Sequence, residues 1–287
     1  MNNNKYKNKH NNDEKNNPKK NNLWNEMKHL QSSYYYLDKF ERIDTNTTFI
    51  ENNIELLKIG NEMFDKFGLD KINIKFFVDV CAAPGMYSKI IYDTYMPTGI
   101  GISLPPEKGG VEFEFKNSSY KQFYKDILEK EYKLEIPKKL DFGIASCVSY
   151  IDDKKNASTI NMELILTSLN IIMNNLMEGG NLIINMTMKN IVLCYNVLYL
   201  LMKQFKTIKL WKSSTVWGTK NTFYIFCYFF TNTIYNDNIK KYIDEIKNPK
   251  SSINNIYIGD DSSFTKITHM MNRIYIIRIN CWLKLLL

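Results

Sequence analysis

An acidic residue and a run of small residues follow one of the most apolar stretches of the chain. Residues 74–80 read IKFFVDV, the pattern of a strand covered on both faces, and Asp79 lies near its end. The next residues read CAAPGMYS and lead into a helical KIIYDTY. Ligands of open α/β sheets bind beyond the carboxyl ends of the strands, where small residues let the backbone approach them.

The residue types in this turn indicate the charge of the ligand. Asp79 is placed to pair with a cationic amino group. A nucleotide pyrophosphate would be repelled by the same carboxylate and would require a GxGxxG turn, which the sequence lacks. The turn therefore predicts a site for a small ligand that carries a positive charge.

Alternating strands and helices must position this turn. Six strands are predicted, separated in part by helices over residues 161–177, where a Gly pair at 179–180 should stop the helix, and 191–205. Helical crossovers imply a mainly parallel sheet. The last two strands are joined by the short loop 213–222 and should pair antiparallel. The predicted strands are residues 74–80, 99–103, 140–146, 181–186, 207–212 and 223–230.

Four segments are predicted along the chain. Residues 1–22 hold six Lys and ten Asn with almost no apolar residue, which predicts a disordered tail and no signal peptide. Residues 23–70 are predicted to be helical, 71–230 form the sheet domain, and 231–287 are a C-terminal extension with a helix at 238–247. The ending IYIIRINCWLKLLL is too short to span a bilayer, so a packed edge, a membrane-surface helix and an incorrectly assigned gene end stay open.

Composition excludes several classes of protein. With 44% hydrophobic and 24% charged residues among 287, the chain is neither wholly disordered nor a multi-span membrane protein, and we expect a cytoplasmic or nuclear location. The net charge of +8 includes +4 in the tail, and abundant Asn, Lys and Ile indicate A/T-rich coding, so charge alone does not argue for nucleic acid.

Five cysteines without a CxxC pair suggest neither a disulfide framework nor a zinc site, and Cys147 is expected to be free, buried and inert.

The segment VDVCAAPGMYSKII resembles the first motif of the FtsJ-like (RrmJ-type) ribose 2′-O-methyltransferases, which bind S-adenosyl-L-methionine (SAM). That family reads APGG or APGF followed by an aromatic residue and Ser; Met86 departs from it, whereas Tyr87 and Ser88 match. Three further segments support the resemblance, which covers roughly residues 58–230: GIGISLPPEKGG (99–110), KDI (125–127) and EGGNLIINM (178–186).

The resemblance implies a Rossmann-like SAM-dependent methyltransferase sheet and SAM as cofactor. No metal is expected, because no cluster of His, Cys and carboxylate residues has the spacing of metal ligands. The methionyl end of SAM would meet the turn after Asp79, and its adenine would lie near Asp126. The positions it implies for cofactor binding are Asp79, Ala82, Ala83, Pro84, Gly85, Met86, Tyr87, Ser88, Ser103, Asp126 and Ser146.

Relatives of this type use a Lys-Asp-Lys-Glu tetrad to remove the ribose proton. The first Lys matches Lys58, but the other three positions match Ser146, Asn185 and Thr222, none of which is a good base near neutral pH. Lys189 and Lys220 lie near the altered positions in the sequence. The departure concerns catalysis and leaves the cofactor motif intact.

The residues and the resemblance leave three alternative functions open. The first is RNA ribose 2′-O-methylation with Lys58 as the catalytic residue. The second is an inactive methyltransferase-fold subunit that binds SAM, RNA or a protein partner. The third is methylation of another acceptor at a site around Asn185 or Cys147. No DNA specificity and no membrane span are implied.

Overall fold

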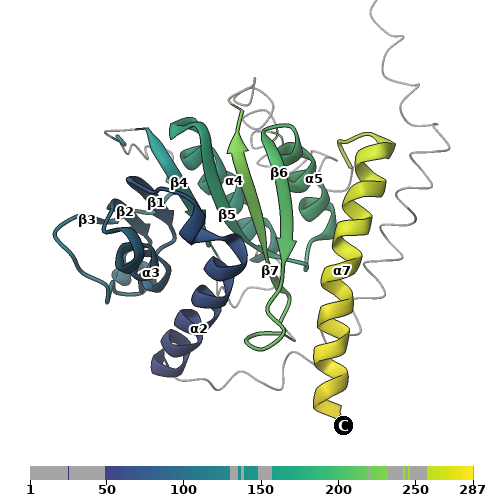
Figure 1. The fold of residues 1–287 in the computed structure, drawn as a ribbon, viewed down its shortest axis with the longest axis horizontal. Helices are drawn as coiled ribbons and strands as arrows, with labels where there is room; N and C mark the ends of the chain where they lie inside the picture. The colour runs from purple at the N-terminus through teal and green to yellow at the C-terminus, as the bar shows by residue number, and fades with distance from the viewer. Residues whose placement is uncertain are drawn as a thin grey trace, which may run out of the picture.

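The computed structural model describes residues 25, 49–129, 135–136, 139–147, 157–218, 220–231, 242, 245 and 257–286. They form a seven-stranded sheet in the order β3-β2-β1-β4-β5-β7-β6 (Figure 1). The strands from β3 to β5 in this order run parallel, and β7 pairs antiparallel with both β5 and β6. The predicted fold class, a mainly parallel sheet with an antiparallel C-terminal pair, is confirmed. The strands are β1 (Phe76–Val80), β2 (Thr98–Ser103), β3 (Tyr120–Tyr124), β4 (Leu140–Ala145), β5 (Leu176–Thr187), β6 (Phe205–Trp211) and β7 (Thr222–Phe230).

Helices cover both faces of the sheet. Helices α4 (Ala157–Asn175) and α5 (Ile191–Met202) cover one face, and α2 (Phe49–Phe67) and α3 (Met86–Tyr95) cover the other (Figure 1). Two short 3-10 turns lie at Leu69–Lys71 and Pro106–Lys108. Alternate residues of each central strand therefore enter opposite cores, since side chains alternate along a strand. In β1, for example, Phe77 packs with α2 and α3, whereas Val78 packs with α4.

Two predictions about the sheet were wrong in detail. Strand β3 was not predicted, because its sequence YKQFY is polar and lies at a sheet edge, with only Tyr120 fully buried. The helix predicted to run to residue 177 ends at Asn175, and β5 begins at Leu176. The Gly pair does not stop the helix but lies inside β5, where Gly179 has φ +78° and the register with β4 shifts.

The C-terminal extension ends in a long packed helix. Helix α7 (Asp261–Leu286) lies beside α5 and β6 (Figure 1) and buries Ile267, Met271, Ile274 and Arg278, as a packed edge would. None of the described helices is both long and apolar enough to cross a membrane. The predicted tail (1–22) lies outside the described residues, as does the predicted helix 238–247 apart from residues 242 and 245.

A buried lysine fixes the loop between β6 and β7. Lys212 is 3% exposed, and its Nζ donates hydrogen bonds to the carbonyl oxygens of Trp217 (3.1 Å), Lys220 (2.7 Å) and Thr222 (2.8 Å). Buried carbonyls need a donor, and charged donors form the stronger bonds. Three carbonyl groups of the loop that leads into β7 are therefore bound by one lysine side chain.

We predict that Lys212→Met lowers the free energy of unfolding by about 3 kcal/mol or more, because hydrogen bonds to charged groups contribute roughly 1.5–3 kcal/mol each. Urea unfolding of the wild-type and Lys212→Met proteins measures the difference, provided that the two proteins unfold with the same m-value. Lys209→Met, at an exposed position of β6, the strand that ends just before Lys212, is the control and should change stability by less than about 1 kcal/mol. Equal effects of the two substitutions would contradict the assigned role.

Candidate active site

The turn after β1 is held by backbone hydrogen bonds. Ala82 N–H donates to the Ile102 carbonyl of β2 (2.9 Å), and Gly85 N–H donates to the Ala82 carbonyl (2.7 Å). Gly85 has φ +97°, a conformation that favours glycine, and a Cβ there would lie 3.1 Å from Cβ of Phe115. The glycine of the motif is thus required both by its backbone angle and by a close neighbour.

A segment that was not predicted to belong to the site covers this turn. The Pro84 carbonyl accepts hydrogen bonds from the N–H groups of Glu114 (3.0 Å) and Phe115 (3.2 Å). The Glu114 carboxylate in turn accepts a hydrogen bond from Asn53 Nδ2 of α2 (2.7 Å). The cofactor turn is therefore tied to α2 through residues 114–115.

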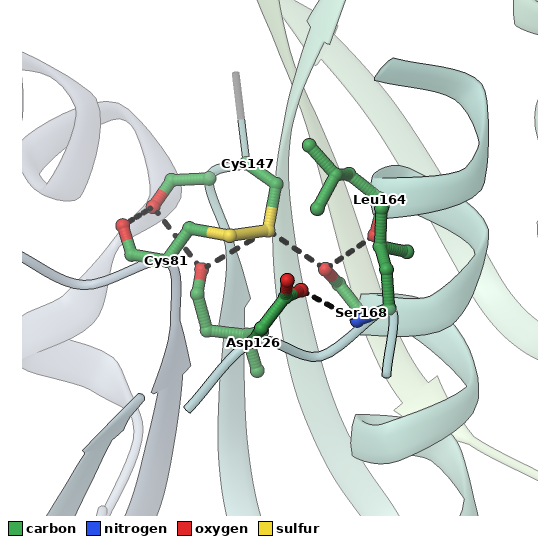
Figure 2. Close-up of a disulfide and its surroundings, with 8 residues drawn as sticks. Cys81, Asp126, Cys147, Leu164 and Ser168 are labelled. Atoms are coloured by element: carbon green, nitrogen blue, oxygen red, sulfur yellow. Dashed lines mark hydrogen bonds between the residues drawn. A yellow bond between two sulfur atoms is a disulfide. The ribbon is translucent and has the colours of Figure 1, made fainter. Parts of the chain in front are cut away.

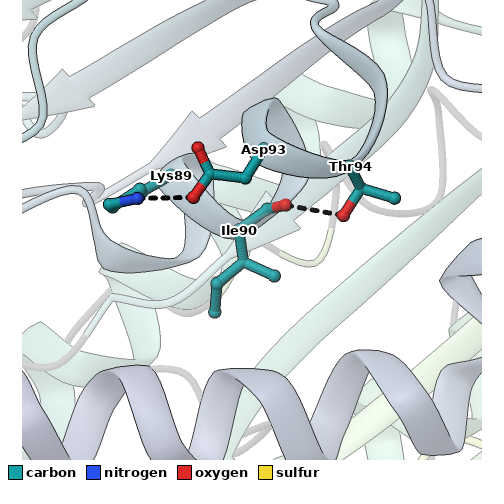
Figure 3. Close-up of polar contacts among 4 residues, drawn as sticks. All are labelled: Lys89, Ile90, Asp93 and Thr94. Carbon is teal, nitrogen blue, oxygen red and sulfur yellow. Dashed lines mark hydrogen bonds and ion pairs between the residues drawn. The ribbon is translucent and has the colours of Figure 1, made fainter.

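Helix α3 begins directly after the turn, with Gly85 at its N-terminal cap position. Its inner side buries Met86, Tyr87, Ser88 and Ile91. On its outer side Lys89 and Asp93 form an i,i+4 ion pair, and Thr94 Oγ1 donates to the Ile90 carbonyl at 2.8 Å (Figure 3). Exposed pairs of this kind contribute about 0.3–0.5 kcal/mol, so burial of the inner residues is what holds α3 against the sheet.

Asp79 lies at the centre of a buried hydrogen-bond chain. Ser88 Oγ donates to Asp79 Oδ2 (2.8 Å), and Ser88 Oγ also lies 2.9 Å from the Tyr120 hydroxyl. Because a serine hydroxyl has one proton, Tyr120 donates to Ser88 and Ser88 donates to Asp79. The chain links β1, α3 and β3. Tyr120 is a site residue that the sequence did not reveal.

Burial gives Asp79 an unusual pKa. Desolvation raises the pKa of this carboxyl from 3.8 to about 7, and the hydroxyls of Ser88 and Ser146 offset only part of the rise. Its Oδ1 atom is buried and has no hydrogen-bond partner within the described part of the chain. A buried acceptor of this kind fits an ammonium group, as the SAM amino group is, because pairing would satisfy both the lone pairs and the charge.

The other predicted cofactor positions surround the same edge of the sheet. Ser103 ends β2 and is buried, and Ser146 follows β4, with its N–H donating to the Val80 carbonyl (3.2 Å). Asp126 follows β3, and its Oδ1 accepts a hydrogen bond from Leu128 N–H (2.9 Å). Ala82, Pro84, Met86 and Tyr87 are buried in the turn and at the start of α3, and Ala83 is half-buried. Nothing in the structure tests these assignments, which stay predictions. The described residues contain no group of three His, Cys, Asp or Glu placed to hold a metal ion.

Two of the altered tetrad positions lie on the sheet face that α2 and α3 cover. Asn185 pairs with Tyr224 and Thr187 pairs with Thr222 between β5 and β7, and directly paired side chains share a face. Asn185 Oδ1 and Thr222 Oγ1 are both buried without a hydrogen-bond partner among the described residues. Beside them the hydroxyls of Tyr224 and Tyr87 are 2.7 Å apart. The site thus holds neutral polar groups where relatives of this type carry Lys and Glu.

Lys58 lies on α2 between two glutamates that bind the β6–β7 loop. Glu55 accepts a hydrogen bond from Trp217 Nε1 (2.6 Å), and Glu62 accepts one from Ser213 Oγ (2.7 Å). Spacings of three and four residues place Lys58 on the same helix face as these carboxylates. Its side chain is exposed, and no described contact joins it to Asn185. Lys58 therefore lies on the face of α2 whose glutamates bind the loop before β7, and its catalytic role stays a prediction.

A disulfide lies beside the turn, contrary to the expectation of free cysteines. Cys81 and Cys147 are bonded across 66 residues, with Cα atoms 5.0 Å apart (Figure 2). Cys147 is buried, as predicted, but it is not free. The prediction failed because sequence spacing shows nothing of the parallel pairing of β1 with β4, which brings the two strand ends together. Cys194, Cys227 and Cys281 are free and buried.

The sheet order, the turn after β1 and the acid beneath it define an α/β methyltransferase domain. The model of the FtsJ-like methyltransferase family matches residues 58–230, which is more than half of the chain. The protein belongs to the FtsJ-like methyltransferase family, whose cofactor is S-adenosylmethionine. No curated protein matches the chain.

Several solved structures resemble the chain at low identity. The N-methyltransferase NodS from Bradyrhizobium japonicum WM9, in complex with S-adenosyl-L-homocysteine, is 14% identical with a TM-score of 0.39, over 74% of this chain and 99% of that one. An rRNA methylase from Streptococcus thermophilus is 12% identical with a TM-score of 0.39, over 59% and 95%. The SAM-bound amino pentose methyltransferase CalS10 from Micromonospora echinaspora is 11% identical with a TM-score of 0.31, over 45% of this chain and only 50% of that one. The family assignment rests on the family model.

The raised pKa of Asp79 predicts a pH-dependent effect of its removal. Between about pH 4 and 7 the folded protein holds a proton that the unfolded chain has released, so this group destabilises the fold as pH rises through that window. We predict that Asp79→Asn raises the thermal midpoint at pH 8 by at least about 3 °C, and by less than half as much at pH 5, because most of the window lies above that pH. Differential scanning calorimetry at both pH values measures this.

The matched control is Asp93→Asn, which removes an exposed carboxylate on α3 and should give a small shift that is equal at both pH values. A shift for Asp79→Asn that does not depend on pH would contradict the buried, protonated state of this carboxyl.

Proposed function

We propose that the protein transfers the methyl group of SAM to a ribose 2′-hydroxyl of RNA. The observation that carries the proposal is the retained cofactor turn, residues 79–88 over a buried acid, in a chain of the FtsJ-like family. The acceptor hydroxyl would lie beyond Gly85 and Ser146, where the ends of β1 and β4 meet. Holding a hydroxyl in line with the sulfonium methyl supplies much of such a rate enhancement, because orientation alone removes a large entropic part of the barrier.

The neutral groups at Asn185 and Thr222 favour a second candidate, a subunit that keeps SAM and RNA binding without catalysis. Their buried oxygens accept hydrogen bonds but do not take a proton near neutral pH. General bases contribute about 10²–10⁴-fold to such reactions, so an enzyme without one would be slow. RNA, or a protein partner in the inactive case, is the proposed partner in both candidates.

The test is transfer of tritiated methyl groups from SAM to RNA by the full-length protein. Capped RNA, uncapped RNA and ribosomal RNA are the substrates, and DNA of the same sequences is the control that lacks the 2′-hydroxyl. The proposal expects counts in at least one RNA and none in its DNA counterpart. Equal counts in RNA and DNA would contradict ribose methylation, and RNA binding without any counts would establish the inactive subunit.

If Lys58 is the base, Lys58→Ala should lower the rate constant for methyl transfer by at least about 10²-fold while leaving SAM affinity within about twofold. Single-turnover kinetics separates the chemical step from binding. The control is Lys66→Ala, another exposed lysine of α2, which should leave the rate unchanged. A Lys58→Ala protein as fast as wild type would show that another group removes the proton.

A further inference from the structure

The Cys81–Cys147 disulfide joins two strand ends that the sheet already holds together. β1 and β4 pair in parallel up to Val80 and Ala145, and Ser146 N–H donates to the Val80 carbonyl. The two cysteines therefore stay neighbours whether or not their sulfur atoms are bonded. The bond can break and form again without rearrangement of the sheet.

The surroundings of Cys147 also suit the reduced thiol. Ser168 Oγ of α4 lies 2.8 Å from Cys147 Sγ, and its hydroxyl donates to the Leu164 carbonyl (2.6 Å), as Figure 2 shows. The single proton of the Ser168 hydroxyl is donated to the Leu164 carbonyl. The contact between Ser168 Oγ and Cys147 Sγ is therefore a hydrogen bond only when Cys147 carries an S–H group, which then donates to Ser168 Oγ. A buried thiol at position 147 thus has an acceptor in place.

Cys81 connects the disulfide to the cofactor turn. It has φ +64°, a left-handed conformation that is uncommon for residues other than glycine, and it packs toward the α4 side with Cys147. Asp79, two residues earlier, bonds Ser88 of α3 on the opposite face of the sheet. Conformations of this kind persist where their surroundings impose them. The bond to Cys147 is a covalent constraint on Cys81, the residue from which the turn 82–85 leaves β1, and it acts beside the backbone hydrogen bonds of that turn.

We propose that Cys81 and Cys147 form a redox-sensitive site that controls SAM binding. The disulfide holds residues 82–85 in the conformation that binds the cofactor, and reduction releases Cys81 from its left-handed conformation and weakens binding. The proposal rests on SAM as the cofactor of the family and does not depend on the RNA substrate.

The reductant is a dithiol, and the partly exposed Cys81 is the accessible sulfur, because Cys147 is 2% exposed. A thiolate of the reductant attacks Cys81 Sγ, the bond between the two cysteines breaks, and Cys147 leaves as a thiolate that takes up a proton. The second thiol of the reductant then attacks the mixed disulfide, which releases Cys81 as a thiol. The protein gains two electrons and two protons, and the dithiol becomes a disulfide.

The test measures the dissociation constant of SAM by calorimetry for the full-length protein equilibrated with glutathione disulfide or with dithiothreitol. Mass mapping of unreduced peptides establishes the oxidation state of residues 81 and 147 in each sample. We expect the oxidised protein to bind SAM about tenfold more tightly. Cys147→Ser should bind with the weaker constant under both conditions, whereas Cys194→Ser, at a free buried cysteine, should keep the tenfold difference.

Dissociation constants within twofold of each other in the two wild-type samples would overturn the proposal, as would the absence of a peptide linking residues 81 and 147 after oxidation. The wild-type comparison decides the matter even if Cys147→Ser does not fold. If neither sample binds SAM, both the redox proposal and the assignment of SAM as the cofactor are wrong. This outcome differs from equal, measurable affinities in the two samples, which would overturn the redox proposal alone.

Discussion

The structure of the site depends on one carboxyl group, that of Asp79, which is fully buried near the end of β1. Burial of an ionised acid is unfavourable, and the surrounding elements are arranged to limit that cost. Ser88 of α3 and Tyr120 of β3 form its hydrogen-bond chain, and Gly101 of β2 leaves the space that the chain needs, since a Cβ there would lie 2.0 Å from the Tyr120 hydroxyl. The remaining oxygen is buried and has no hydrogen-bond partner among the described residues. A carboxyl group that destabilises the fold thus lies beneath the predicted cofactor turn, and shifted pKa values of this kind are common at functional sites.

The strands and the antiparallel pair could be predicted because their signals are local. Residues 76–80 are uniformly apolar around one acid, and loop 213–222 is too short to contain a crossover helix. Strand β3 lacks such a signal, because its alternation of polar and aromatic residues at a sheet edge is weak. The role of Tyr120 could not be predicted, because it depends on residues of three strands that meet only in the folded sheet. The same holds for Cys81 and Cys147, whose pairing follows from the register of β1 with β4.

The positions predicted for cofactor binding and those of the altered tetrad lie on different parts of the sheet. The motif that resembles the family's cofactor turn lies between β1 and α3, whereas the altered tetrad positions lie at the ends of β4, β5 and β7. The structure places Asn185 and Thr222 on the face covered by α2, next to the hydrogen-bonded Tyr87 and Tyr224. It also places Lys58 on the α2 face whose glutamates hold the β6–β7 loop. The sequence shows that the residues at the altered positions are neutral, but only the fold shows that Asn185 Oδ1 and Thr222 Oγ1 are buried without a hydrogen-bond partner among the described residues.

The measurement that tests the central role of Asp79 most directly is calorimetric titration of the protein with SAM at pH 6 and pH 7.5. The carboxyl has a pKa of about 7, so it is mostly protonated at pH 6 and mostly ionised at pH 7.5, and only the ionised form attracts an ammonium group. Saturable binding that is several-fold tighter at pH 7.5, with this difference lost in Asp79→Asn, is the predicted result. Equal affinity at the two pH values in the wild-type protein, or no binding at either, would contradict the account.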